Sequence, residues 1–224
     1  MPNPILVALD LPTASAATCL ASQLKPHVGG FKVGLELFCA AGAGIVEEIG
    51  PAQVFLDLKF HDIPNTVAGA SRVAARLGVM FFNVHCLGGA AMMRAAREAA
   101  GEEDANAKVI GVTILTSHDE AQLRAIGLAG SPADNVRRLA LLARESGLAG
   151  VVCSPHEIES VRAECGPDFL LVTPGVRPAG GDLNDQKRVM TPREALAAGA
   201  DWLVIGRPIT AAGDPIGATR NMLD

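Results

Sequence analysis

The stretch Ile5-Leu-Val-Ala-Leu-Asp-Leu-Pro12 discriminates between the two common architectures of parallel α/β proteins. Its first five residues are all apolar, which predicts a strand buried on both faces. In an open doubly wound sheet that binds a dinucleotide, a G-x-G-x-x-G motif follows the first strand. Here Asp10, Leu11 and Pro12 follow it instead, without a glycine. The stretch therefore favours a closed barrel over the open sheet.

Seven further apolar runs follow along the chain, and stretches with helical spacing lie between most of them. The eight runs are 5–9, 30–33, 54–58, 80–84, 109–114, 150–153, 169–172 and 202–205. The helical stretches are 14–24, 66–77, 91–100, 133–145 and 192–198. Dividing 224 residues by eight gives 28, about the length of one strand–helix repeat. We therefore predict one α/β domain over residues 1–224, folded as a (β/α)8 TIM barrel.

Two helix starts agree with this division. Ser131-Pro-Ala-Asp134 and Thr191-Pro-Arg-Glu194 each place a hydroxyl before a proline, with an acid three residues after the hydroxyl. This is the pattern of a capping box with proline in the first turn. We expect a helix to begin at each position.

The composition excludes several classes of protein. With 49% hydrophobic and 19% charged residues, the chain can bury a core without disulfides. A net charge of -5 provides no basic excess for a nucleic-acid backbone. Five irregularly spaced cysteines without a C-x-x-C pair suggest neither a disulfide framework nor a zinc cluster. No apolar run approaches the roughly 20 residues that span a bilayer. We expect a soluble cytoplasmic protein that binds neither nucleic acid nor membrane.

Polar residues follow several of the predicted strands, and barrels of this kind carry their active sites at the carboxyl ends of the strands. These residues are Asp10, Lys32, Asp57, Lys59, His61, Asp62, Asn83, His85, Thr116 and Ser117. Residues two apart on a strand share a face, so Asp57 and Lys59 are predicted to point into the barrel mouth together. A single Asp-x-Lys pair is more often a structural ion pair at the rim, although such pairs stabilise a fold only weakly. The clustering of Asp10, Lys32 and Asp62 with this pair favours a catalytic array.

A second group lies after the last two predicted strands, where this barrel class often binds phosphate. The candidate ligands are Gly175, Arg177, Gly206 and Arg207. Arg207 is the stronger candidate of the two arginines. It comes soon after the predicted strand 202–205, and its guanidinium presents a planar fork of donors that suits phosphate oxygens. The segment 174–189 is long for a simple connection and is predicted to be a lid, from which Gln186 could reach the phosphate.

The ten-residue string Asp57-Leu-Lys-Phe-His-Asp-Ile-Pro-Asn-Thr66 resembles the signature of the orotidine 5'-phosphate decarboxylase family. Further matching motifs follow the order of that family along nearly the whole chain. They are 7–10 (VALD), 32–34 (KVG), 83–85 (NVH), 115–117 (LTS), 173–177 (TPGVR), 185–186 (DQ) and 206–208 (GRP). The resemblance implies a bacterial-type enzyme that converts orotidine monophosphate to UMP and CO2 in de novo pyrimidine biosynthesis.

The resemblance also implies residue roles. Asp57, Lys59 and Asp62 would form a charged array beside the C6 carboxylate of the substrate, completed by Lys32. Lys59 would protonate C6 after CO2 leaves. The family is a homodimer, and Asp62 and Thr66 would enter the site of the neighbouring subunit. The implied binding residues are Asp10 and Lys32 for the ribose, Thr116 or Ser117 for the pyrimidine, and Arg177, Gln186, Gly206 and Arg207 for the phosphate.

This chemistry needs no cofactor or metal, because a nearby ammonium supplies both the positive charge and the proton for a carbanion at C6. Asp57 would act either by destabilising the bound carboxylate or by positioning Lys59. One alternative is a metal-dependent relative, similar to 3-keto-gulonate-6-phosphate decarboxylase or hexulose-6-phosphate synthase, in which a glutamate that binds magnesium replaces Lys32. Another is a catalytically silent nucleotide-binding barrel, which would be expected to lose Lys59 or an aspartate of the array.

Overall fold

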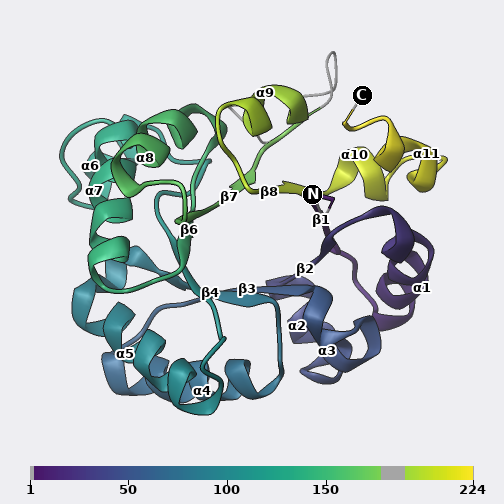
Figure 1. The fold of residues 1–224 in the computed structure, drawn as a ribbon, viewed down its shortest axis with the longest axis horizontal. Coiled ribbons are helices and arrows are strands. Elements are labelled where there is room, and N and C mark those ends of the chain that lie inside the picture. The colour runs from purple at the N-terminus through teal and green to yellow at the C-terminus, as the bar shows by residue number, and fades with distance from the viewer. Residues whose placement is uncertain (1–2, 178–189, 224) are drawn as a thin grey trace.

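Eight parallel strands close into a barrel in the computed structural model, which describes residues 3–177 and 190–223 (Figure 1). The strands are β1 (Ile5–Ala8), β2 (Gly30–Gly34), β3 (Val54–Phe60), β4 (Phe81–His85), β5 (Val109–Val112), β6 (Gly150–Val152), β7 (Leu170–Pro174) and β8 (Trp202–Ile205). They neighbour one another in chain order, and β8 pairs with β1 to complete the ring. The predicted (β/α)8 barrel is confirmed, and no strand end differs by more than two residues from its predicted run.

Helices surround the strands on the outside of the ring (Figure 1). They are α1 (Ala14–Leu24), α2 (Leu35–Ala41), α3 (Gly44–Ile49), α4 (Pro64–Arg76), α5 (Gly89–Glu103), α6 (Glu120–Ala125), α7 (Pro132–Glu145), α8 (Ile158–Cys165), α9 (Pro192–Ala197), α10 (Arg207–Thr210) and α11 (Pro215–Arg220). Ser131 and Thr191 form the two predicted capping boxes at the starts of α7 and α9. No helix among the described residues is both long enough and apolar enough to cross a bilayer.

Side chains on each strand alternate between the helices outside and the barrel interior, as strand geometry requires. The outward residues, such as Val7 and Leu56, pack beneath the helices. The inward apolar residues form a separate cluster: Leu6, Ala8, Phe55, Phe81, Ile110, Val172 and Val204. The rings of Phe55 and Phe81 lie 4.8 Å apart at their centroids within this cluster. We call these residues the barrel floor, because they fill the interior below the polar mouth.

Regular pairing between β3 and β4 is interrupted at the mouth. Leu56 pairs with Phe82 and Phe60 pairs with Val84, so three residues of β3 lie opposite one residue of β4. Lys59 lies in this bulge with φ 52°, and among the described residues it is the only non-glycine with positive φ. Bulges of this kind re-aim side chains next to active sites. The bulge therefore alters the direction of β3 where its charged residues emerge.

Candidate active site

A cavity of about 310 Å³ opens above the barrel floor, within the range typical of small-molecule sites. Phe55 and Val204 of the floor form part of its wall, so its inner end is apolar. Further apolar side chains line the rest, together with the charged and polar residues Lys32, Asp57, Lys59, Thr116 and Ser117. The residues around it are Lys32, Phe55, Asp57, Lys59, Val112, Ile114, Leu115, Thr116, Ser117, Val152, Cys153, Pro174 and Val204. We call this the inner cavity.

A second cavity of about 410 Å³ adjoins the first, because both are lined by Lys32, Pro174 and Val204. Its remaining lining residues are Ala8, Asp10, Gly175, Arg177, Gly206, Arg207 and Thr210. Two arginines and one lysine make this outer cavity suited to an anionic group. The two cavities together offer an elongated site with an apolar inner end and a cationic outer end.

A chain of ion pairs connects the two cavities. The Nζ atom of Lys32 lies 2.8 Å from Asp10 Oδ1 and 3.5 Å from Asp57 Oδ2. On the other side, the Nζ atom of Lys59 lies 2.7 Å from Asp57 Oδ1. Asp57 is thus held between two ammonium groups, and the acids and bases alternate along the chain. The predicted constellation is present for Asp10, Lys32, Asp57 and Lys59.

Two opposing effects act on the pKa of Asp57. Burial of its carboxyl alone would raise the pKa, because it removes the charged form from water. The charges of Lys32 and Lys59 and the hydrogen bonds from Lys59 and Asn83 outweigh this effect and lower the pKa below its ordinary value. Asp57 is therefore a carboxylate at neutral pH, and the inner cavity contains a fixed negative charge beside the Lys59 ammonium.

Glycines give the chain room at two points of the site. At Gly34, a Cβ atom would lie 2.7 Å from Lys32 Nζ and 3.0 Å from Asp10 Oδ1, so any larger residue would displace this ion pair. Gly175 follows β7 with φ 80°, a conformation that side chains rarely adopt. Gly175 thereby turns the chain towards Arg177, which lines the outer cavity.

The structure brings together most of the predicted site residues. The residues that line the two cavities are Asp10, Lys32, Asp57, Lys59, Thr116, Ser117, Arg177, Gly206 and Arg207. Asp62 and Thr66 line neither cavity and are both exposed. Gln186, together with most of the predicted lid at 174–189, lies outside the described residues.

The expectation that Asp62 joins the charged array does not hold within a single chain. Its Oδ1 atom accepts a hydrogen bond from the backbone N–H of Ile63 at 2.6 Å, and no ion pair joins Asp62 to Lys59. The reason is local: after Lys59 the chain leaves the barrel, and residues 61–66 are all exposed.

The sequence prediction assigned no role to two features at the mouth. Asn83 is fully buried and bonds to both Asp57 and Lys59, although the sequence marked it only by its place at the end of an apolar run and in the family-like motif 83–85. His61 and His85 stack on each other beside the site, and the sequence placed both at strand ends without a role. In each case the partner lies on a neighbouring strand, so the contact depends on strand pairing.

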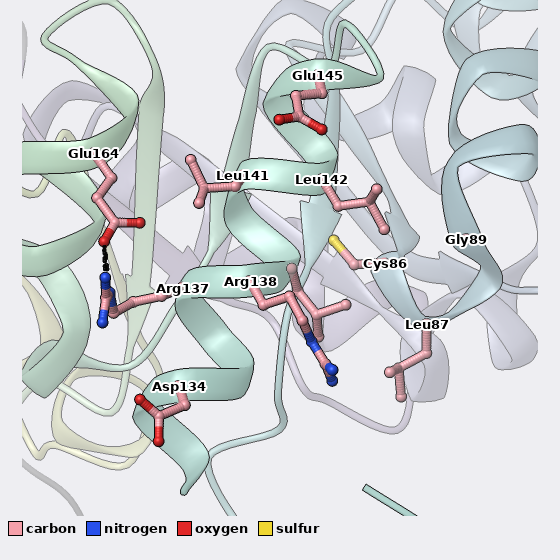
Figure 2. A pocket seen from close by; sticks show the side chains of 11 residues that line it. Cys86, Leu87, Gly89, Asp134, Arg137, Arg138, Leu141, Leu142, Glu145 and Glu164 are labelled. Carbon is pink, nitrogen blue, oxygen red and sulfur yellow. Dashed lines mark hydrogen bonds and ion pairs between the residues drawn. The ribbon is translucent and has the colours of Figure 1, made fainter. Parts of the chain in front are cut away.

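A larger open groove of about 650 Å³ lies on the outer surface, away from all predicted site residues. Figure 2 shows Arg138, Leu142 and Glu145 of α7 facing this groove, with Cys86 and Leu87 on its far side. Arg137, also on its wall, pairs with Glu164. In this groove Arg137 and Glu164 neutralise each other, whereas in the inner cavity Lys32 and Lys59 both contact Asp57.

Fold and site together define the class of protein: a (β/α)8 barrel with a charged cavity at the carboxyl ends of its strands, where enzymes of this fold carry out their chemistry. The sequence model of the orotidine 5'-phosphate decarboxylase / HUMPS family matches residues 3–222. The chain therefore belongs to this family.

Individual relatives agree with this assignment. A protein of Moorella thermoacetica named orotidine 5'-phosphate decarboxylase is 56% identical, covering 96% of this chain and 89% of the relative. A protein of the same name from Nitrosococcus oceani is 55% identical, covering 96% and 94%. The crystal structure of orotidine 5'-phosphate decarboxylase from Lactobacillus acidophilus superposes with a TM-score of 0.86 at 39% identity, covering 98% of this chain and 97% of that one.

Proposed function

We propose that this protein decarboxylates orotidine 5'-monophosphate to UMP and CO2, as its relatives' names state for them. The observation that carries the proposal is the position of the Lys32–Asp57–Lys59 network, between an apolar inner cavity and a cationic outer one. The pyrimidine would occupy the inner cavity beside Thr116 and Ser117. The phosphate would occupy the outer cavity beside Arg177 and Arg207, with Gln186 as a further proposed ligand.

In this mechanism the bond between C6 and its carboxylate breaks, and CO2 leaves while the electron pair stays on C6. Lys59 donates a proton from Nζ to C6, and its amine then regains a proton from solvent. Asp57, 2.7 Å from Lys59 Nζ, holds the ammonium in place, and Lys32 adds a second positive charge. Asp10 and Lys32 would bind the ribose hydroxyls. This mechanism uses only groups of the protein.

Proton donation by Lys59 cannot account for the whole lowering of the reaction barrier. A positioned general acid contributes about 10²–10⁴-fold, whereas enzymes lower barriers by about 8–23 kcal/mol. Fixed charges in a site shielded from water contribute more than the same charges in solution. The rest of the barrier lowering comes from the binding energy of the distant phosphate. Arg177 and Arg207 would bind this phosphate and so orient the substrate.

The active form would be a homodimer in which Asp62 and Thr66 of one subunit complete the site of the other. The exposure of residues 61–66 supports this arrangement, because exposed loops can reach a partner, and Ile63 leaves 66% of its surface uncovered. The five cysteines, none of them paired, support a location in the reducing cytoplasm.

The direct test follows the ultraviolet absorbance of orotidine 5'-monophosphate after addition of purified protein in excess chelator. Conversion to UMP would establish a metal-independent decarboxylase. Activity only on a keto-sugar phosphate in the presence of magnesium would assign the chain to the metal-dependent branch of the family. Binding of UMP without turnover of either substrate would indicate a silent nucleotide-binding barrel.

A further inference from the structure

Asn83 lies opposite the bulge of β3 and is the only residue of β4 between the paired positions Phe82 and Val84. The facing segment of β3 holds three residues, Asp57 to Lys59. A single side chain therefore faces both charged residues of the inner cavity. Asn83 is fully buried, so its amide must find partners within the protein.

Both ends of the Asn83 amide are bonded to this segment. Its Nδ2 atom donates to Asp57 Oδ1 at 2.6 Å, and its Oδ1 atom accepts from the backbone N–H of Lys59 at 2.7 Å. Lys59 Nζ binds the same oxygen, Asp57 Oδ1, at 2.7 Å. The three residues form a closed ring of hydrogen bonds that includes the backbone of Lys59.

The backbone of Lys59 needs such support. Its φ of 52° lies in the left-handed region, which is costly for a residue with a long side chain. The Lys59 N–H lies where the regular pairing of β3 with β4 is interrupted, and it donates to the side chain of Asn83. An amide is suited to this position because it donates to a carboxylate with one atom and accepts from an N–H with the other.

We propose that Asn83 is a positioning residue, which holds the Lys59 ammonium and the Asp57 carboxylate in register by fixing the backbone of the bulge. The inference rests on the proposed function. Asn83 touches no cavity wall itself, so it acts through Asp57 and Lys59 and not on the substrate.

The test compares Asn83→Leu and Asn83→Asp with the wild type and with Asn135→Leu. Asn135 is the matched control, because it is also a buried asparagine whose amide is bonded at both ends: it donates to Ala129 O and Ser131 O and accepts from Arg138. It lies on α7, away from both cavities. For each protein, kcat, KM and the pH dependence of kcat are measured with orotidine 5'-monophosphate. Melting temperatures report folding.

Asn83→Leu is expected to lower kcat by about 100-fold, the effect of a small misplacement of a catalytic group, and to change KM less than about threefold. Loss of the Nδ2 donor removes one interaction that lowers the pKa of Asp57, so the acid limb of the kcat profile should move to higher pH. Asn135→Leu should lower the melting temperature and leave the kcat profile unchanged.

Asn83→Asp gives the opposite pH response. The new side chain still accepts from Lys59 N–H, but it can donate to Asp57 only while protonated. Its activity relative to the wild type should therefore rise as the pH falls. If Asn83→Leu does not fold, this nearly isosteric variant decides the question alone.

Three results would overturn the proposal: a folded Asn83→Leu with kcat within about threefold of the wild type, an unmoved pH profile, or a relative activity of Asn83→Asp that does not change with pH. Wild-type turnover in the same assay tests the proposed function separately. A crystal structure of Asn83→Leu adds a readout that needs no activity, since Lys59 should leave the left-handed region.

Discussion

The imidazole of His85, at the end of β4, stacks on that of His61 with ring centroids 5.4 Å apart and an interplanar angle of 23°. Burial of His85, together with the charges of His61, Lys59 and His118, lowers the pKa of His85 to about 4. All three neighbouring groups are basic, so protonation of His85 would add a positive charge to a site that already holds one. His85 is therefore uncharged at neutral pH.

His85→Asn should flatten the pH dependence of stability below neutrality. An unfolded histidine takes up its proton near pH 6.5, whereas folded His85 does so only near pH 4. Between these values the unfolded state binds more protons, so stability rises with pH, and acidification from pH 6.5 to 4 weakens the fold. Since His85 is partly exposed, we expect a loss of about 1–2 kcal/mol across this window. Urea unfolding at several pH values measures it.

His156→Asn is the control for this experiment, since His156 is exposed in η4 (Pro155–Glu157). The free energy of unfolding of His156→Asn should change with pH as that of the wild type does, because this variant keeps His85. If the free energy of unfolding of His85→Asn falls with acidification as steeply as that of the wild type, His85 is not the source of the pH dependence.

Lys59→Ala should lower kcat by at least about 10³-fold, because it removes both the proton donor and a fixed positive charge. UMP should still bind within about tenfold of the wild-type affinity, since the outer cavity keeps its arginines. Absorbance assays and calorimetric titration measure the two quantities. Lys108→Ala, at an exposed position, should match the wild type in both. Substantial turnover by Lys59→Ala would exclude Lys59 as the acid.

Arg207→Ala should weaken the binding of UMP by about 10–100-fold, the value of one charge-assisted hydrogen bond. Binding of uridine, which lacks the phosphate, should change little. Arg220→Ala, at an exposed position in α11, controls for loss of a nearby surface charge. Equal losses for UMP and uridine would remove Arg207 from the phosphate site.

Asp62→Ala and Lys59→Ala should complement each other when mixed. If Asp62 acts on the neighbouring subunit, a mixed dimer carries both lesions in one site and leaves the other intact. Random exchange of subunits in a symmetric dimer should then restore about a quarter of wild-type activity. Each variant alone should stay nearly inactive. A mixture that exchanges subunits without recovering activity would place Asp62 in the site of its own chain.

Local sequence patterns predicted the elements that depend on local physics. The eight strands follow from apolar runs, and the starts of α7 and α9 follow from capping hydroxyls at Ser131 and Thr191. The short helices α2 and α3 were not predicted, because six or seven residues give too little periodicity. The helices α6, α8, α10 and α11 were not predicted either.

In the site, too, local sequence pattern predicted some features, whereas features that depend on strand pairing were not predicted. Alternation correctly predicted that Asp57 and Lys59 face one cavity. It could not predict that Lys59 reaches this cavity from a left-handed backbone, since the bulge arises from the pairing of β3 with β4. Asp62 is three residues from Lys59 in the sequence, but residues 61–66 are exposed, so the two side chains do not share a cavity in this chain.

The barrel floor has a consequence for the route by which the products leave. Among the described residues, Phe55, Phe81 and their apolar neighbours fill the barrel interior below the inner cavity and close its lower end. On the proposed function, CO2 forms beside Asp57 and Lys59, above this apolar floor. CO2 and UMP would therefore leave through the same mouth, so both products share one exit.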